Sequence, residues 1–428
     1  MSTWAWPGIV LQAECDPMPR SLPAVGQPIS LDAIIDTFIG QSEGVLSLTS
    51  WAPDSAFFWM SSGSAALTLC NQALTREGKQ WEVIMPAYSC PSLPAAAIRA
   101  GLKPVLCDTE RDCFRMSLDS LSSRIGPNTV AVIAVHLLGI PERIIEIREI
   151  ARRNNIILIE DAAQAFGNSV HAEGKNSGTS DSEPEKHQYL GTFGDIGIFS
   201  FRRGKPLGLL GGGVILANNR RSRESIRAQY DSLTENYSPP SLSYLINLLL
   251  YSVFFHPNIY WMPQRLPWLQ LGETIFTLDY EVKRLNPKIL RLGGRLIPAF
   301  EKIRRKRQEL AKVYKEKLEP LRQEFVFLPE PGDNRIALLR FPFILKSKEK
   351  RDRILAELKR KGLGATGSYP VPLNEQPGAA EYFDEKETFP NAKFVSERIL
   401  TLPLHEYVTG SDIEKIIGVM EKGLSGKS

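Results

Sequence analysis

Residues 194–205 of the chain read Gly194-Asp-Ile-Gly-Ile-Phe-Ser200-Phe-Arg-Arg-Gly-Lys205. Its apolar run from Ile196 to Phe199 predicts a short buried strand that ends at Ser200. Lys205 follows five residues later, so backbone on both sides holds it in a turn. Partial burial lowers the pKa of a lysine amine, and the neutral amine can then attack an aldehyde. The stretch therefore predicts a lysine suited to carbonyl chemistry, with an ordinary solvated loop lysine as the alternative.

A glycine-rich turn from Gly208 to Gly213 follows this lysine and leads into a second apolar strand, Val214 to Ala217. The turn lacks the G-x-G-x-x-G spacing of dinucleotide-binding loops, and it precedes a strand rather than a helix. We therefore do not interpret it as a dinucleotide fingerprint.

The second informative stretch lies upstream and reads Ile156-Ile-Leu-Ile-Glu-Asp161-Ala-Ala-Gln164-Ala-Phe-Gly167. Four apolar residues predict a buried parallel strand, and acidic residues stand at its carboxyl end, where open α/β sheets bind ligands. A buried carboxylate needs a cationic partner, and a protonated pyridine nitrogen would be one. Gln164 follows three residues after Asp161 and could hydrogen-bond near the same ring. The alternative for Asp161 is a helix N-cap after a strand.

In order and spacing, the two stretches together resemble the DegT/DnrJ/EryC1/StrS sugar aminotransferases, a family of fold type I pyridoxal-phosphate enzymes. The resemblance covers about residues 57–220 well and 335–420 loosely. It implies an α/β fold, in which a large domain with a mostly parallel, seven-stranded-type sheet carries a small C-terminal α+β domain.

The resemblance also implies roles for single residues. Lys205 would bind pyridoxal 5'-phosphate covalently and later move a proton, while Asp161 would keep the pyridine nitrogen protonated. Gln164 would hydrogen-bond near the ring, and Ser200 would contact the phosphate. The implied reaction moves an amino group from an amino acid such as glutamate to a keto sugar, nucleotide-linked by family analogy. Such enzymes serve the biosynthesis of cell-surface polysaccharides or secondary metabolites.

Two further candidate regions lie nearer the N-terminus. A strand from Phe57 turns through small residues into a helix, and the resemblance assigns Gly63, Ser64 and Ala65 to the cofactor phosphate; a plain serine N-cap is the alternative. Tyr88 follows the next strand, and the resemblance stacks its ring on the pyridine. A surface or core tyrosine is the alternative for Tyr88.

Composition narrows the class of protein. The chain has 428 residues, of which 43% are hydrophobic, which is enough for a large core and suggests two domains. A net charge of +4 gives no strong electrostatic case for nucleic acid. The five cysteines show no paired metal spacing and the five histidines are scattered, so we expect no metal site. The cysteine pattern also indicates a reduced cytoplasmic protein. No basic region followed by an apolar core opens the chain, so we expect no secretory signal.

Strands alternate with helices over much of the chain, which predicts a mostly parallel sheet with covered faces. We expect an N-terminal arm over residues 1–55 and a large cofactor-binding domain over 56–295, with an apolar insertion at about 236–270. Residues 296–428 would form a linking helix, from Leu296 to about Leu321, and the small C-terminal domain. His136, which follows a strand, is expected to be a structural residue or part of the site wall rather than a catalytic residue.

A segment without any Asp, Glu, Lys or Arg runs from Asn236 to Gln264. Pro257 and Pro263 interrupt its apolar run, so it predicts an amphipathic or re-entrant hairpin rather than a spanning helix. The hairpin would lie on a membrane surface or across a subunit interface, and we favour the interface. The polar stretch between residues 168 and 190 predicts a mobile loop, with a substrate flap as the alternative.

Three departures from the family pattern concern the substrate. Pro206 follows the lysine where the family usually has Asn, Gly211 replaces an acidic residue, and the family's N-x-R motif is not found. These differences weaken the prediction of a sugar substrate more than the prediction of the cofactor. A different pyridoxal-phosphate reaction, on another or a lipid-linked substrate, and a non-catalytic regulator with the same fold are the alternatives. The family resemblance also implies a cytoplasmic homodimer.

Overall fold

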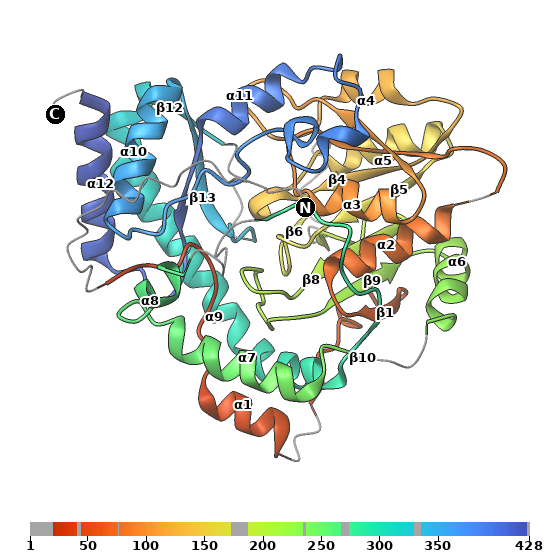
Figure 1. Ribbon diagram of the computed structural model, residues 1–428, viewed down its shortest axis with the longest axis horizontal. Coiled ribbons are helices and arrows are strands. Elements are labelled where there is room, and N and C mark those ends of the chain that lie inside the picture. Colours follow the sequence, from red (N-terminus) through yellow and green to blue (C-terminus); the bar gives the residue numbers. More distant parts are fainter. Residues whose placement is uncertain are drawn as a thin grey trace, which may run out of the picture.

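A large sheet with helices on both faces carries a smaller unit at one side in the computed structural model (Figure 1). The structure describes residues 20–40, 44–75, 77–172, 187–233, 237–266, 274–328 and 335–425. In this part of the chain the large sheet has nine strands in the order β10-β11-β1-β9-β8-β5-β4-β2-β3. Their bounds are β1 (Ala56–Met60), β2 (Glu82–Pro86), β3 (Lys103–Cys107), β4 (Thr129–Val135), β5 (Ile157–Asp161), β8 (Ile196–Ser200), β9 (Gly213–Ala217), β10 (Tyr237–Ser238) and β11 (Arg284–Leu285).

Strand direction places one set of carboxyl ends along a single edge of this sheet. Strands β3, β2, β4, β5 and β8 are parallel to one another. β9 is antiparallel to β8, and β1 is antiparallel to β9, so β1 points the same way as β8. The predicted mostly parallel, seven-stranded type of sheet is therefore confirmed, and the two-residue strands β10 and β11 extend it.

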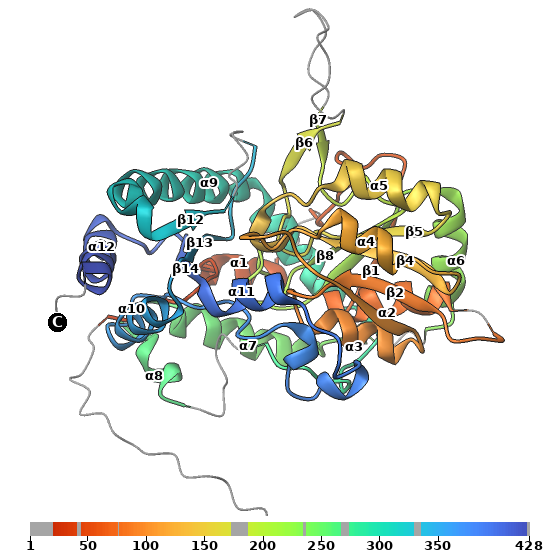
Figure 2. The ribbon, with the colours of Figure 1, turned by 90° about the horizontal axis from the view of Figure 1, so that it is seen from above.

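Helices cover both faces of the sheet (Figure 2). Helices α2 (Gly63–Leu74), α3 (Ser92–Arg99) and α6 (Arg220–Asp231) add buried side chains to one apolar cluster, and α4 (Leu118–Arg124) and α5 (Ile144–Arg153) add theirs to the other. Neighbouring strand residues divide between the two faces, as for Met85 and Ile84 on β2. Each central strand is thus buried on both sides, which explains the continuous apolar runs in the sequence.

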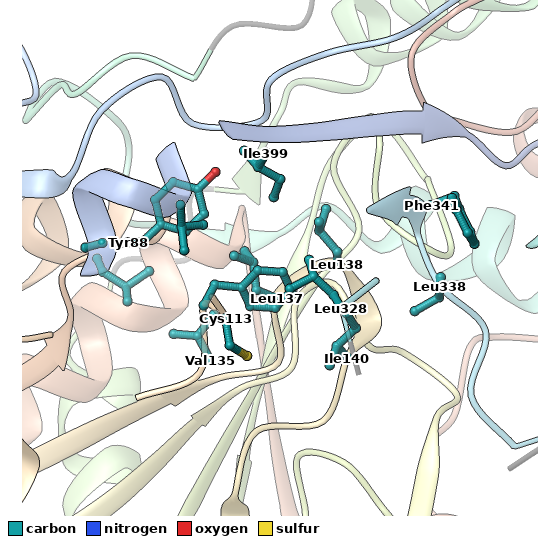
Figure 3. Close-up of a cluster of buried hydrophobic side chains, with 14 of the residues drawn as sticks. Tyr88, Cys113, Val135, Leu137, Leu138, Ile140, Leu328, Leu338, Phe341 and Ile399 are labelled. Carbon is teal, nitrogen blue, oxygen red and sulfur yellow. The ribbon is translucent and has the colours of Figure 1, made fainter. Parts of the chain in front are cut away.

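The small unit contains an antiparallel sheet in the order β12-β13-β14. Its elements are β12 (Phe325–Phe327), β13 (Arg340–Leu345), β14 (Ile399–Pro403), α10 (Lys348–Arg360), α11 (Pro390–Arg398) and α12 (Gly410–Ser425). Leu137 and Leu138, which follow β4, share an apolar cluster with Phe341 and Ile399 of this unit (Figure 3). The Leu339 amide also donates to the Leu138 carbonyl at 2.8 Å. The small unit is thereby fixed beside the carboxyl edge of the large sheet.

Helix α9 (Pro287–Leu318) connects the two units and begins earlier than the sequence suggested. We expected the helix to begin at Leu296, but the side chain of Asn286 caps it by accepting from the Lys288 amide at 2.9 Å. Pro287 occupies the first turn, where its missing N–H carries no cost. Division of the chain into domains at residues 55 and 295 stays a prediction.

The remaining elements lie around this frame. They are α1 (Leu31–Phe38), α7 (Ser241–Phe254), α8 (Trp261–Gln264) and a hairpin of β6 (Ser169–His171) with β7 (His187–Tyr189). The predicted polar loop begins and ends in this hairpin, and residues 173–186 of it lie outside the described part. In the ranges that the structure describes, no helix is long and apolar enough to cross a membrane.

Segment 20–24 is tied to the small unit by two buried basic side chains. His405 Nε2 donates to the Pro23 carbonyl at 2.8 Å, and Arg340 donates to the Ala24 carbonyl. Burial lowers the pKa of His405 to about 4, and the charges of Arg340 and Arg307 act in the same direction. His405 is therefore neutral in the folded protein at neutral pH.

This histidine should make folding sensitive to acid. Its pKa in the unfolded chain is close to the ordinary 6.5, so between pH 6.5 and 4 the unfolded state binds the extra proton and gains relative stability. Relative to a His405→Asn variant, we expect the wild type to lose up to about 3 kcal/mol across that window. Urea unfolding at a series of pH values measures this difference. A stability difference that is independent of pH would contradict the buried neutral histidine.

Gly197 on β8 allows the closest backbone approach in the central sheet. A Cβ atom added there would lie 1.9 Å from the Gly191 carbonyl oxygen, whereas one added at Gly418 of α12 meets nothing within 4 Å. We expect Gly197→Ala to lower the free energy of unfolding by more than about 2 kcal/mol. The control Gly418→Ala should raise it by about 0.5–1 kcal/mol, because alanine is the better helix former. Equal unfolding midpoints for the two variants would show that the approach is not as close as described.

Candidate active site

The residues singled out from the sequence gather at the carboxyl edge of the large sheet. Each follows, or ends, a strand that points to this edge. Gly63, Ser64 and Ala65 follow β1, Tyr88 follows β2, Asp161 ends β5 and precedes Gln164, and Ser200 ends β8 and precedes Lys205. Residues far apart in sequence therefore come together in one place, where open α/β sheets bind ligands.

Asp161 is a buried carboxylate with one oxygen left open. Its Oδ1 accepts a hydrogen bond from the Ala163 amide at 3.0 Å, and no donor within the described ranges reaches Oδ2. Burial raises the pKa of Asp161, while the positive charge of Lys205 acts in the opposite direction. A second cationic donor at Oδ2 would favour the ionised carboxylate further.

Lys205 is only partly buried, in the connection between β8 and β9. Its backbone amide donates to the Arg202 carbonyl at 3.2 Å, and the same loop closes on itself through Leu209 N and Phe201 O at 2.7 Å. Two buried side chains from other helices donate to carbonyls of the loop. Arg307 Nη2 on α9 reaches Pro206 O at 3.1 Å, and Tyr244 Oη on α7 reaches Leu209 O at 2.7 Å.

Arg307 is a buried cation without an acidic partner in the described part of the chain. Burial, and then the charge of Arg304, lowers its pKa to about 10, so the guanidinium stays charged at neutral pH. Its role in the loop is to satisfy a carbonyl beside the lysine. Sequence reasoning missed both Arg307 and Tyr244 because each reaches the loop only through the tertiary fold.

The start of α2 offers an anion site next to Ser200. Ser62 is the N-cap, and its hydroxyl accepts from the Ala65 amide at 3.1 Å. The Ala65 amide is therefore engaged by the protein, as in the serine N-cap alternative, and the assignment of Gly63, Ser64 and Ala65 to the phosphate stays a prediction. The Ser64 amide has no acceptor within the described residues. A Cβ on Gly63 would lie 2.8 Å from the Ser200 Cβ, so glycine is what lets the helix start approach this serine.

Tyr88 and Gln164 are joined by Tyr369 of the small unit. The Tyr88 ring is buried and lies edge-on to Tyr369 with centroids 5.9 Å apart. Gln164 Nε2 donates to Tyr369 Oη at 3.2 Å, and its Oε1 accepts from the Leu138 amide at 3.0 Å. Both ends of the Gln164 amide are thus engaged by the protein. Nothing in the local sequence around Tyr369 showed that it belongs to this site.

Glu160, the neighbour of Asp161, has a structural task. Its buried carboxylate accepts from the Gly191 amide at 2.8 Å and the Gly194 amide at 2.5 Å. His136 Nδ1 accepts from the Glu142 amide at 3.0 Å, so its Nε2 carries the hydrogen and donates to Glu160 at 3.0 Å. The expected structural role of His136 agrees with these contacts. Together these hydrogen bonds to Glu160 fix the loop that leads into β8.

The arrangement fits pyridoxal phosphate. Asp161 Oδ2 is free to accept from a pyridinium nitrogen, Lys205 provides an amine, and the Ser64 amide with the Ser200 hydroxyl can bind phosphate. One of the sequence departures also has a physical reason. A Cβ on Gly211 would lie 3.0 Å from Ile289 Cδ1, which leaves little room for an acidic side chain.

Among the residues described, no group of three His, Cys, Asp or Glu side chains is placed to hold a metal ion.

Comparison with known proteins agrees with the geometry. The sequence model of the DegT/DnrJ/EryC1/StrS aminotransferase family matches residues 57–235 and 292–421. The chain is 26% identical over 367 residues to a UDP-N-acetyl-3-dehydro-alpha-D-glucosamine 3-aminotransferase of Acidithiobacillus ferrooxidans, covering 85% of this chain and 83% of the relative. It is 24% identical to a dTDP-4-dehydro-2,3,6-trideoxy-D-glucose 4-aminotransferase of Saccharopolyspora spinosa, with coverage of 87% and 85%.

The fold is also that of a solved structure, the PLP form of the putative sugar aminotransferase Spr1654 from Streptococcus pneumoniae. The TM-score is 0.70 at 18% identity, and the match covers 94% of this chain and 99% of that one. At this identity the likeness shows the fold alone.

The contact between Tyr244 and the lysine loop can be tested against a matched control on the same helix. Burial raises the pKa of Tyr244 and of Tyr251, so both hydroxyls stay protonated. The Tyr244 hydroxyl donates to Leu209 O at 2.7 Å, and the Tyr251 hydroxyl donates to Gln27 O at 2.9 Å. Each Tyr→Phe change should cost about 1 kcal/mol of folding stability. Only Tyr244→Phe should also weaken pyridoxal-phosphate binding, by about fivefold in a spectrophotometric titration. Equal binding by the two variants would show that this hydrogen bond does not position the loop.

Proposed function

Because the chain belongs to the DegT/DnrJ/EryC1/StrS aminotransferase family, we propose that it moves an amino group from an amino acid, glutamate, to a nucleotide-linked keto sugar. The product would serve cell-surface polysaccharide or secondary-metabolite biosynthesis. The observation that carries the proposal is the position of Lys205, whose charge acts on the buried Asp161 at the carboxyl edge of the sheet. Enzymes of this family use pyridoxal phosphate.

The residues present would divide the work of binding. The Ser64 amide at the start of α2 and the Ser200 hydroxyl would hold the phosphate, and Asp161 Oδ2 would accept the hydrogen of the pyridine nitrogen. Tyr88 would cover the ring, while Gln164 and Tyr369 hold that wall through their hydrogen bond. Bound there, the cofactor supplies an aldehyde for the amine and an aromatic ring that withdraws electrons.

Lys205 would be the catalytic residue. Its Nζ would bind the cofactor and, once an amino donor has displaced it, would take the proton from the donor's α-carbon and return it as a general acid. The hydrogen bonds from Arg307 and Tyr244 to the loop would limit its movement and so keep Nζ in place for the proton transfer.

Two relatives support a sugar acceptor, since both are named for amination of nucleotide-linked sugars, one at carbon 3 and one at carbon 4. The family match omits residues 236–291, where the family's N-x-R motif would be expected. We propose that this chain builds that side of its sugar pocket from other residues.

The cytoplasmic location and the homodimer are part of the proposal. A lipid surface and a second subunit are the two partners that the charge-free segment 236–264 could meet.

Absorption spectra test the lysine and the reaction class in turn. We expect wild-type protein with pyridoxal phosphate to show the near-visible band of a lysine-bound cofactor, and Lys205→Ala to lack it. Lys283→Ala is the control, because Lys283 lies beside the start of α2 and pairs with Glu281 on the surface. Excess glutamate should then shift the wild-type spectrum to the pyridoxamine form.

Loss of the band only in Lys283→Ala would contradict the assignment of Lys205. A band that no amino acid shifts would contradict aminotransfer and favour another pyridoxal-phosphate reaction.

A further inference from the structure

Two arginines in the interior have no carboxylate partner. Arg307 on α9 is 1% exposed and Arg340 on β13 is 5% exposed, and neither forms an ion pair within the described ranges. Arg340 donates to three backbone carbonyls and a threonine hydroxyl, whereas Arg307 donates to one carbonyl alone. Carbonyl dipoles replace the hydration of a guanidinium only in part. Two buried positive charges without a counter-charge therefore need a physical explanation.

Both guanidinium groups lie in one neighbourhood. After burial, the charges of Arg340 and Arg307 lower the pKa of His405, so both arginines are close to this imidazole. The carboxylate of Asp412 also acts on His405, in the opposite direction, but Arg20 already binds both of its oxygens, at 3.3 and 3.0 Å. That pair is neutral as a whole, so the two buried arginines leave the region with a net positive charge.

Segment 23–27 of the chain runs through this neighbourhood. His405 Nε2 donates to the Pro23 carbonyl at 2.8 Å, and Arg340 donates to the Ala24 carbonyl. At the other end of the segment, Tyr251 Oη donates to the Gln27 carbonyl at 2.9 Å. The ring of Phe255 connects the two ends, since it stacks on Tyr251 at 4.8 Å and lies 6.0 Å from the His405 ring, measured between centroids.

Unpartnered polar atoms accompany these charges. The Gln27 side chain is 2% exposed, and both its Nε2 and its Oε1 lack a hydrogen-bond partner among the described residues, as does Nε of Arg307. Burial and then Arg304 lower the pKa of Arg307, while Tyr251 opposes them, so Tyr251 lies near the guanidinium as well as near Gln27. Buried donors of this kind destabilise a fold unless a ligand or water completes their hydrogen bonds.

We propose that Arg307 and Gln27 bind one small monovalent anion, of which chloride is the simplest, beside the lysine loop. The N–H groups of Arg307 Nε and Gln27 Nε2 would donate to the anion, and Arg340 would add its positive charge. The segment is closely packed, because a Cβ on Gly26 would lie 2.7 Å from the Phe255 ring and 2.8 Å from Tyr251 Oη. Such packing favours a single ion over a bulky carboxylate or a phosphate.

Charge favours an anion over water at this place. A water molecule could accept from the same N–H groups, but it would leave both guanidinium charges uncompensated.

The proposed site also touches the lysine loop on both sides of Lys205. Val25 Cγ1 would lie 3.0 Å from a Cβ on Gly204, and Arg307 Nη2 donates to the Pro206 carbonyl at 3.1 Å. An anion that fixes Arg307 and segment 23–27 would therefore support the loop from outside the cofactor site. The proposal itself does not rest on the proposed function, since anion binding requires neither turnover nor a sugar.

Thermal unfolding of the purified full chain tests the site. Sodium gluconate is exchanged for sodium chloride at constant ionic strength, so that only the size of the anion changes. We expect about 200 mM chloride to raise the Tm of the wild type by about 3 °C. Gln27→Leu removes a donor at similar volume, and its Tm should rise by less than about 1 °C. In gluconate this variant should be at least as stable as the wild type, because an apolar group replaces an unpartnered amide.

Asn71→Leu is the matched control. Asn71 on α2 is likewise fully buried, and neither end of its amide has a partner in the described part of the chain. Because Asn71 is not part of the proposed site, this variant should keep the full response to chloride. A wild type that does not respond to chloride, or an equal response by the wild type and Gln27→Leu, would overturn the proposal.

Crystals of the wild type soaked in bromide give a second measurement, which does not depend on the folding of any variant. We expect an anomalous peak within hydrogen-bond distance of Arg307 Nε and Gln27 Nε2. Peaks confined to the protein surface would show an adventitious ion only and would contradict the site, as would an ordered water at that position in the presence of bromide.

Discussion

The buried carboxylate of Asp161 is the constraint on which the site depends. Burial works against its charge, and the cation described nearby, Lys205, stands on the connection after another strand. For the two groups to act on each other, β5 and β8 must be neighbours, parallel and in register, as the pairing of Asp161 with Ile198 makes them. The sheet order thus decides the chemistry, because it brings a carboxylate and an amine to one edge.

Much of this arrangement could be predicted from the sequence. Apolar runs followed by small or acidic residues mark strands and their carboxyl ends, and strands alternating with helices imply that these ends meet. Asp161, Ser200 and Lys205 could be found in this way, because each is defined by a local pattern. The start of α9 was misplaced by local reasoning, since the cap at Asn286 and the Pro287 that follows it were not weighed.

The residues that support the site were beyond local patterns. Tyr369 comes from the small unit, Arg307 from the connecting helix and Tyr244 from α7. Each has an ordinary sequence context and gains its role from a partner 35 or more residues away. Only the fold shows that they hold the lysine loop and the wall formed by Gln164.

We propose that Lys205 binds the cofactor opposite Asp161. The most direct measurement is borohydride reduction of the protein with pyridoxal phosphate, followed by peptide mass spectrometry. We predict one phosphopyridoxyl group on Lys205, with its yield greatly reduced in Asp161→Ala. A label spread over surface lysines, or one placed on another residue at full yield, would contradict the assignment of Lys205.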